Sequence, residues 1–112
     1  MTKTLGYARR SWGIQVVALY VSVPARTTVK VTCKGRGCPH GTFVKRSKKK
    51  STQLRFTGFR GFVKAGAKIT VISSRHGSIA EYFTWTVRGD HKEPLKRKRC
   101  KAPGAKKYGS CH

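Results

Sequence analysis

Acidic residues are almost absent from this chain. Its 112 residues include 26 lysines and arginines but only three carboxylic side chains, so the formal net charge is +23. A compact domain with this charge repels itself, and its surface suits an anionic partner such as nucleic acid, a wall polymer or an anionic membrane surface. The shortage of carboxylates also leaves little material for general acid–base catalysis by a carboxylate pair.

Other features of enzymes and membrane proteins are missing too. No apolar run is long enough to span a bilayer, so we expect no transmembrane segment. No glycine-rich phosphate loop connects a strand to a helix. Serines flank His76 in a turn, but that turn supplies neither the orienting acid nor the oxyanion hole of a catalytic triad. We therefore expect a protein without enzymatic activity and without a cofactor.

Alternation of apolar and polar residues is the main structural pattern in the chain. Within residues 27–34, Val29, Val31 and Cys33 face one way, and a basic, hydroxylated set of side chains faces the other. Similar alternation predicts strands in residues 13–23, 42–46, 52–56, 68–74 and 80–88. In the first of these we expect an inward face made of Val17, Leu19, Val21 and Val23. Residues 47–50 are predicted to form a hairpin tip, and residues 57–66 a glycine-punctuated loop.

The spacing of these strands predicts the fold class. About six or seven short strands, separated by frequent turns, indicate an all-β protein, either a single small β-sandwich or a small barrel. We expect a basic N-terminal lead in residues 1–12, the sandwich in residues 13–89 and a basic tail in residues 90–112. Cysteines in the tail suggest that it is pinned to the sandwich.

The cysteines allow three interpretations. Cys33, Cys38, Cys100 and Cys111 are an even set in a small chain, which fits two disulfides with three possible connectivities. The first alternative is a zinc site, in which Cys33 and Cys38 are joined by ligands from among His40, Cys100, Cys111 and His112. The second is a set of free structural thiols. Because Cys100 and Cys111 are too far apart to form a second knuckle, we expect a disulfide-closed turn at residues 33–38 and no metal.

Several motifs in order resemble a small domain of putative secreted actinobacterial proteins. They are the C-x4-C-P stretch "PARTTVKVTCKGRGCP" (residues 24–39), the basic "KRSKKKSTQLRF" (45–56), the segment "FVKAGAKITVISSRHGSIAEYFTWTVRG" (62–89) and a final "RC" followed by "PG". The resemblance covers nearly the whole chain. It implies an extracellular, immunoglobulin-like or fibronectin-like β-sandwich with oxidised cysteines, without catalysis and without an established ligand. A virion or other assembly protein that carries this module would also fit, and an intracellular protein bound to nucleic acid is the alternative location.

Basic residues fall into three clusters, which we take as candidate polyanion-binding residues. The first holds Lys45, Arg46, Lys48, Lys49 and Lys50, the second Arg55, Arg60 and Lys64, and the third Lys96, Arg97, Lys98, Arg99 and Lys101. Aromatic residues near such charges are candidates for stacking on bases. These are Trp12, Phe59, Tyr82 and Tyr108.

No recognition helix or RNA-binding signature is visible, so sequence-specific reading is not expected. The sequence therefore predicts non-specific binding to a nucleic-acid phosphate backbone. The alternative is a secreted or surface structural module, whose cations bind teichoic acid, acidic polysaccharide or neighbouring subunits. Edge strands of such a sandwich could also support self-assembly.

Overall fold

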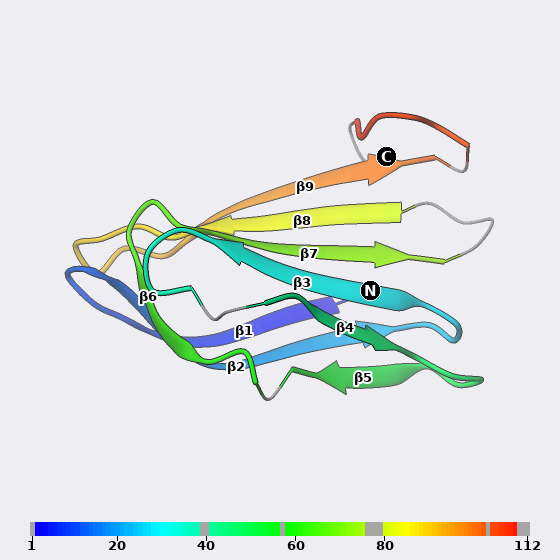
Figure 1. The fold of residues 1–112 in the computed structure, drawn as a ribbon, viewed down its shortest axis with the longest axis horizontal. Coiled ribbons are helices and arrows are strands. Elements are labelled where there is room, and N and C mark those ends of the chain that lie inside the picture. Colours follow the sequence, from blue (N-terminus) through cyan, green and yellow to red (C-terminus); the bar gives the residue numbers. More distant parts are fainter. Residues whose placement is uncertain (1, 39–40, 57, 76–79, 103, 110–112) are drawn as a thin grey trace.

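The described residues form strands and connecting segments only. The computed structural model describes residues 2–38, 41–56, 58–75, 80–102 and 104–109, in which nine strands form two antiparallel sheets (Figure 1). The described residues include no helix with the length and apolar character needed to cross a membrane. This arrangement confirms the predicted all-β sandwich, although it has more strands than expected.

One layer is a four-stranded sheet built around a long central strand. Strand β2 (Gly13–Val23) pairs along its whole length with β1 (Thr2–Arg9). On its other side it pairs with β5 (Thr52–Arg55) near its C-terminal end and with β6 (Gly61–Lys64) near its N-terminal end. Residues 57–66, predicted to be a loop, therefore contain a short strand. Gly58, Gly61 and Gly66 in this segment obscure the alternation that marks the other strands.

The second layer is a five-stranded sheet with the order β4-β3-β7-β8-β9. Its members are β3 (Thr28–Lys34), β4 (Phe43–Arg46), β7 (Lys68–Ser74), β8 (Ala80–Thr86) and β9 (Leu95–Lys101). Strands β1 and β9 lie in the segments that were expected to be a lead and a tail. The two sheets thus extend beyond residues 13–89 on both sides.

The lysine-rich segment after β4 is a crossover between the sheets, so the predicted hairpin is wrong. Strand β4 pairs with β3 in one sheet, whereas β5 pairs with β2 in the other. Ser47 anchors the start of the crossover: its hydroxyl accepts a hydrogen bond from the Thr27 amide at 2.9 Å and donates one to the Pro24 carbonyl at 2.6 Å. The alternation in the sequence does not distinguish a crossover from a hairpin here, because both flanking strands are short and contain basic residues.

A β-bulge in β2 corrects the predicted inward face of that strand. Gly6 pairs with Ala18 and Tyr7 with Val16, so Val17 is the extra residue and is 51% exposed. Leu19 and the valines that follow it face the core as predicted, while on the other side of the bulge the core face continues with Val16 and Ile14. A single inserted residue shifts the alternation by one position.

Apolar side chains from both sheets fill the space between them. The buried set includes Ile14, Val16, Leu19, Val21, Val29, Val31, Phe56, Phe59, Val63, Ile69, Val71, Trp85 and Val87. At one edge of this core, the ammonium of Lys3 on β1 forms a buried ion pair with Glu81 on β8 and lies 5.0 Å from the ring centre of Phe83. Burial, with a smaller contribution from Lys98, lowers the pKa of Lys3 from 10.5 to about 8. An inward-pointing charge of this kind also discourages edge strand β1 from pairing with another chain.

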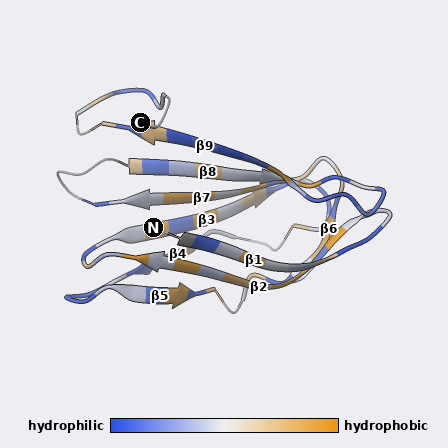
Figure 2. Ribbon diagram, turned by 180° about the vertical axis from the view of Figure 1, so that it is seen from behind, coloured by the Kyte–Doolittle hydropathy of each residue, from blue (hydrophilic) through white to orange (hydrophobic). Residues whose placement is uncertain are grey.

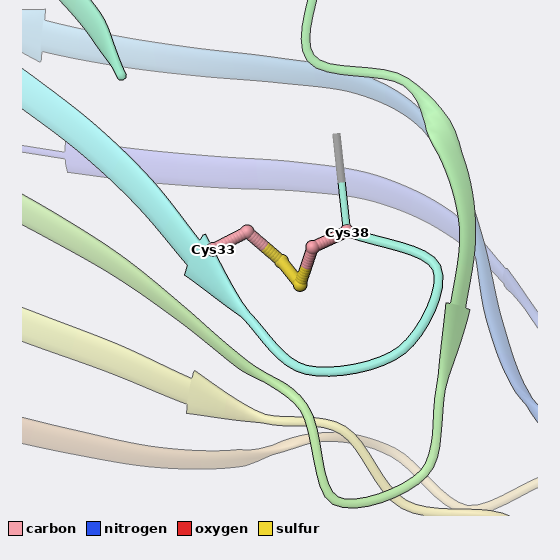
Figure 3. The surroundings of a disulfide bond; sticks show 2 residues. All are labelled: Cys33 and Cys38. Atoms are coloured by element: carbon pink, nitrogen blue, oxygen red, sulfur yellow. A yellow bond between two sulfur atoms is a disulfide. The ribbon is translucent and has the colours of Figure 1, made fainter. Parts of the chain in front are cut away.

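A disulfide between Cys33 and Cys38 closes the turn after β3 (Figure 3). The two Cα atoms are 5.4 Å apart, which is an ordinary separation for a disulfide. The closed turn packs against the other sheet, because the carbonyl of Arg36 accepts a hydrogen bond from the amide of Lys64 in β6. Gly37 sits at the closest approach: its φ is +78°, and any Cβ atom at this position would lie only 1.9 Å from the Phe62 carbonyl oxygen. The disulfide turn therefore joins the two layers.

Candidate polyanion-binding surface

The outward side of the five-stranded sheet carries a broad set of cations. Because side chains alternate along a strand, residues directly opposite each other in register share a face. Val29, Val31 and their partners point into the core, so the residues between them point outward. We define the cationic face as the outward basic residues of this sheet, which are Lys30, Lys34, Arg46, Lys68, Arg97, Arg99 and Lys101.

Two lysines on the cationic face stand directly opposite each other. Lys34 on β3 pairs in register with Lys68 on β7, and both side chains are exposed. Like charges at opposed positions of an antiparallel pair destabilise the sheet. An anion bound between the two ammonium groups would remove this repulsion. An anionic ligand bound at this pair is therefore expected to stabilise the folded chain.

Threonines occupy the middle of the same face. Thr32, Thr70 and Thr84 lie in one row across β3, β7 and β8, and Arg97 of β9 continues that row. Threonine hydroxyls are common hydrogen-bond donors to phosphate oxygens. Thr84 is buried, so the accessible neutral donors of this row are the half-buried Thr32 and Thr70 on β3 and β7.

The three side-chain carboxylates of the chain, all of them in described residues, are not among the outward residues of the five-stranded sheet. Glu81 is on the inward side of β8 and is paired with Lys3, while Asp90 and Glu93 lie in the connection between β8 and β9. Within the described part of the chain, the Lys3–Glu81 contact is the one ion pair. The outward cations of the sheet are therefore not neutralised by acidic side chains of the described residues.

The first predicted cluster is divided between the cationic face and the crossover. Arg46 is on the cationic face, whereas Lys45 points to the other side, where its ammonium donates to the carbonyl of Arg55 and lies near the ring of Phe56. Lys45 thus connects the sheets. The remaining members, Lys48, Lys49 and Lys50, are exposed on the crossover and line an open hollow of about 730 Å³.

The second predicted cluster lies on the opposite face of the molecule. Arg55 and Lys64 are outward on the four-stranded sheet, as their register with β2 requires. The guanidinium of Arg55 is 5.7 Å from the ring centre of Tyr20, and the ammonium of Lys64 is 4.2 Å from that of Trp12. Arg60 is exposed between β5 and β6. The fold therefore separates this cluster from the cationic face by the full thickness of the sandwich.

The third predicted cluster forms strand β9, the edge strand of the five-stranded sheet and its most hydrophilic strand (Figure 2). Arg97, Arg99 and Lys101 are on the cationic face, and Lys96 and Lys98 alternate to the other side. Strands β4 and β9 are at opposite edges, four strand intervals or roughly 19 Å apart. Lys30, Lys34 and Lys68 fill the space between them. Lys30 and Lys34 were not among the predicted site residues, although the alternation already placed both outward.

The predicted stacking residues have different environments. Phe59 is fully buried and packs edge-on against Phe43 with ring centres 5.6 Å apart, so this candidate is a core residue and is not available for stacking on bases. Tyr82 is on the cationic face, where Tyr108 covers it at 5.3 Å between ring centres. Trp12 is half-buried beside Phe62, which is 57% exposed and was missed.

The disulfide also bears on the zinc alternative. With Cys33 and Cys38 bonded to each other, neither sulfur is a thiolate ligand for a metal. Cys100 is also disulfide-bonded, while Cys111, His40 and His112 lie outside the described residues. No cluster of three potential ligands occurs in the part of the chain that the structure describes.

Comparisons with known proteins give no family assignment. No protein family, curated protein or solved structure matches this chain. Its function must therefore be argued from the surface described above.

Proposed function

We propose that this chain is a non-catalytic module that binds the phosphate backbone of a polyanion, foremost nucleic acid, without reading its sequence. The observation that carries the proposal is the opposed Lys34–Lys68 pair within a face that has no carboxylate among the described residues. Such a face attracts a chain of phosphates by charge and offers hydroxyl donors between the charges. It is a sheet surface, and the described residues supply no helix to enter a major groove, which supports backbone contacts over base contacts.

The expected affinity depends strongly on salt. If the cationic face neutralises about six phosphates of a DNA duplex, the logarithm of the binding constant falls with the logarithm of salt concentration with a slope of about −5. The affinity would then drop roughly a thousandfold between 50 and 200 mM salt. Such steep dependence is a property of counterion release and would not arise from a small apolar contact.

Titration of the protein with duplex DNA, single-stranded RNA and polyphosphate at several salt concentrations tests the proposal. Fluorescence anisotropy of a labelled oligonucleotide should show binding to each polymer, with little difference among scrambled sequences. Saturable binding that does not change with salt would contradict the proposal, as would the absence of binding at the low-salt end of the series.

A second candidate is an extracellular polymer with the same phosphate chemistry. The Cys33–Cys38 disulfide favours it, because disulfides persist in oxidising surroundings outside the reducing cytosol. Teichoic acid, which carries phosphodiesters without bases, is the polymer to compare. Competition between teichoic acid and DNA for the labelled complex distinguishes the sources: displacement at similar phosphate concentration indicates a general phosphate binder, and a clear preference identifies the class of polymer.

A further inference from the structure

A hollow lies at β9, the edge strand of the five-stranded sheet. It has a volume of about 420 Å³ and is lined by Arg97, Lys98, Arg99, Tyr108 and Gly109. Arg97 and Arg99 share the outward face of β9, so two guanidiniums and a tyrosine border a space large enough for a phosphate group and its neighbouring atoms. The lining contains no carboxylate, which distinguishes it from the ordinary mixed-charge surface of a soluble protein.

The segment that follows β9 builds one wall of this hollow. It turns back after Lys101, so that the amide and carbonyl of Gly109 each form a backbone hydrogen bond with Cys100, at 2.7 and 2.8 Å (Figure 1). The ring of Tyr108 then lies against Tyr82, and the ammonium of Lys101 is 5.7 Å from the Tyr108 ring centre. These contacts hold Tyr108 beside the arginines.

The cations of the hollow have no acidic partner among the described residues. The nearest carboxylate in register is Glu81, opposite Cys100, and it points inward to Lys3. Arg97 and Lys98 are exposed, and Arg99 is half-buried beside the tyrosines. An anion in the hollow would therefore meet charges that are not already paired within the described chain.

We propose that this hollow seats a single phosphate group, and that the bound polyanion is fixed there while its other phosphates contact the cationic face more loosely. This inference rests on the proposed function. Guanidinium groups suit the assignment because each can donate two parallel hydrogen bonds to phosphate oxygens. The Tyr108 hydroxyl supplies a further donor at the rim.

A matched pair of double variants tests the proposed phosphate site in the hollow. Arg97→Gln with Arg99→Gln removes two cations from the hollow, and Lys30→Gln with Arg46→Gln removes two cations from the same cationic face outside the hollow. Affinity for a duplex oligonucleotide should fall roughly ten- to hundredfold more in the first variant than in the second, because two charge-assisted contacts are lost. Thermal melts of both variants verify that they are folded.

A direct titration with inorganic phosphate completes the test. In wild-type protein it should shift the NMR signals of the Tyr108 ring and the arginine side chains of β9, and in the Arg97/Arg99 double variant it should not. Tyr108→Phe, which keeps the stacked ring, should weaken phosphate binding several-fold. If both double variants lose DNA affinity equally, and inorganic phosphate causes no local NMR shifts, the phosphate site in the hollow is refuted. The proposed function is not affected by that result. Salt-independent or absent DNA binding by the wild type would instead overturn the proposed function, while the phosphate shifts would still report on the hollow.

Discussion

Replacement of two buried serines by alanine should change the free energy of unfolding differently. Ser47→Ala should lower it, whereas Ser73→Ala should leave it unchanged or raise it slightly. The hydroxyl of Ser47 accepts the amide hydrogen of Thr27 and donates to the carbonyl of Pro24. Ser73 is equally buried, but its hydroxyl has no hydrogen-bond partner within the described part of the chain. A satisfied buried hydroxyl stabilises its neighbours, whereas an unsatisfied one is a cost that the folded state bears.

The size of each effect follows from what remains after the change. In Ser47→Ala the Thr27 amide loses its acceptor in a residue that is 1% exposed, while water can reach exposed Pro24. An unsatisfied buried amide costs about 1–3 kcal/mol, so we expect the free energy of unfolding to fall by about 2 kcal/mol. Ser73→Ala removes only an unpaired hydroxyl, and we expect no loss of stability or a gain of up to about 1 kcal/mol.

Urea denaturation followed by circular dichroism measures both effects, and Ser51→Ala is the control because Ser51 is exposed in the same crossover as Ser47. The control should stay within about 0.5 kcal/mol of the wild type. The reasoning fails if Ser47→Ala matches the control, or if Ser73→Ala is destabilised as much as Ser47→Ala.

Three further predictions concern the core, the disulfide and the buried lysine. Leu19→Ala should cost about 2–5 kcal/mol in urea unfolding, whereas Val17→Ala at the exposed bulge should cost less than about 1 kcal/mol, and similar losses would contradict the bulge. Replacing Cys33 and Cys38 by alanine should cost about 2 kcal/mol, the loop-entropy value for so short a loop, and an unchanged urea midpoint would argue against it. Because burial lowers the pKa of Lys3 from 10.5 to about 8, the unfolded chain binds more protons between these two values, so stability should rise with pH across this window. Lys3→Met should reduce that rise, and an identical pH profile in the variant would refute the shift.

Strands with strong alternation were predictable from the sequence, and strands held by long-range contacts were not. The predicted ranges 13–23 and 68–74 coincide with β2 and β7, where β-branched residues alternate with polar ones. Strand β9 has almost no apolar residue, so its main support is pairing with β8. In β1 the inward position of Lys3 hides the pattern, because its partner Glu81 is distant in the sequence.

The candidate site was predictable in its charge but not in its geometry. Alternation alone placed Lys30 and Lys34 outward, and the run of cations in β9 was visible as a cluster. Which lysine opposes Lys34 depends on the register between β3 and β7, which a single sequence does not specify. The division of the other clusters between two faces likewise follows from the crossover after Ser47, which the sequence pattern presented as a hairpin.

The most direct test of the proposed function is a map of the binding surface. Amide chemical shifts of isotope-labelled protein, recorded during titration with a short DNA duplex, should change along the outward positions of β3, β7, β8 and β9, above all near Lys34, Lys68 and Arg97. The outward residues of β2, β5 and β6 should change much less. Shifts concentrated on that four-stranded sheet, or spread evenly over both faces, would contradict binding through the cationic face.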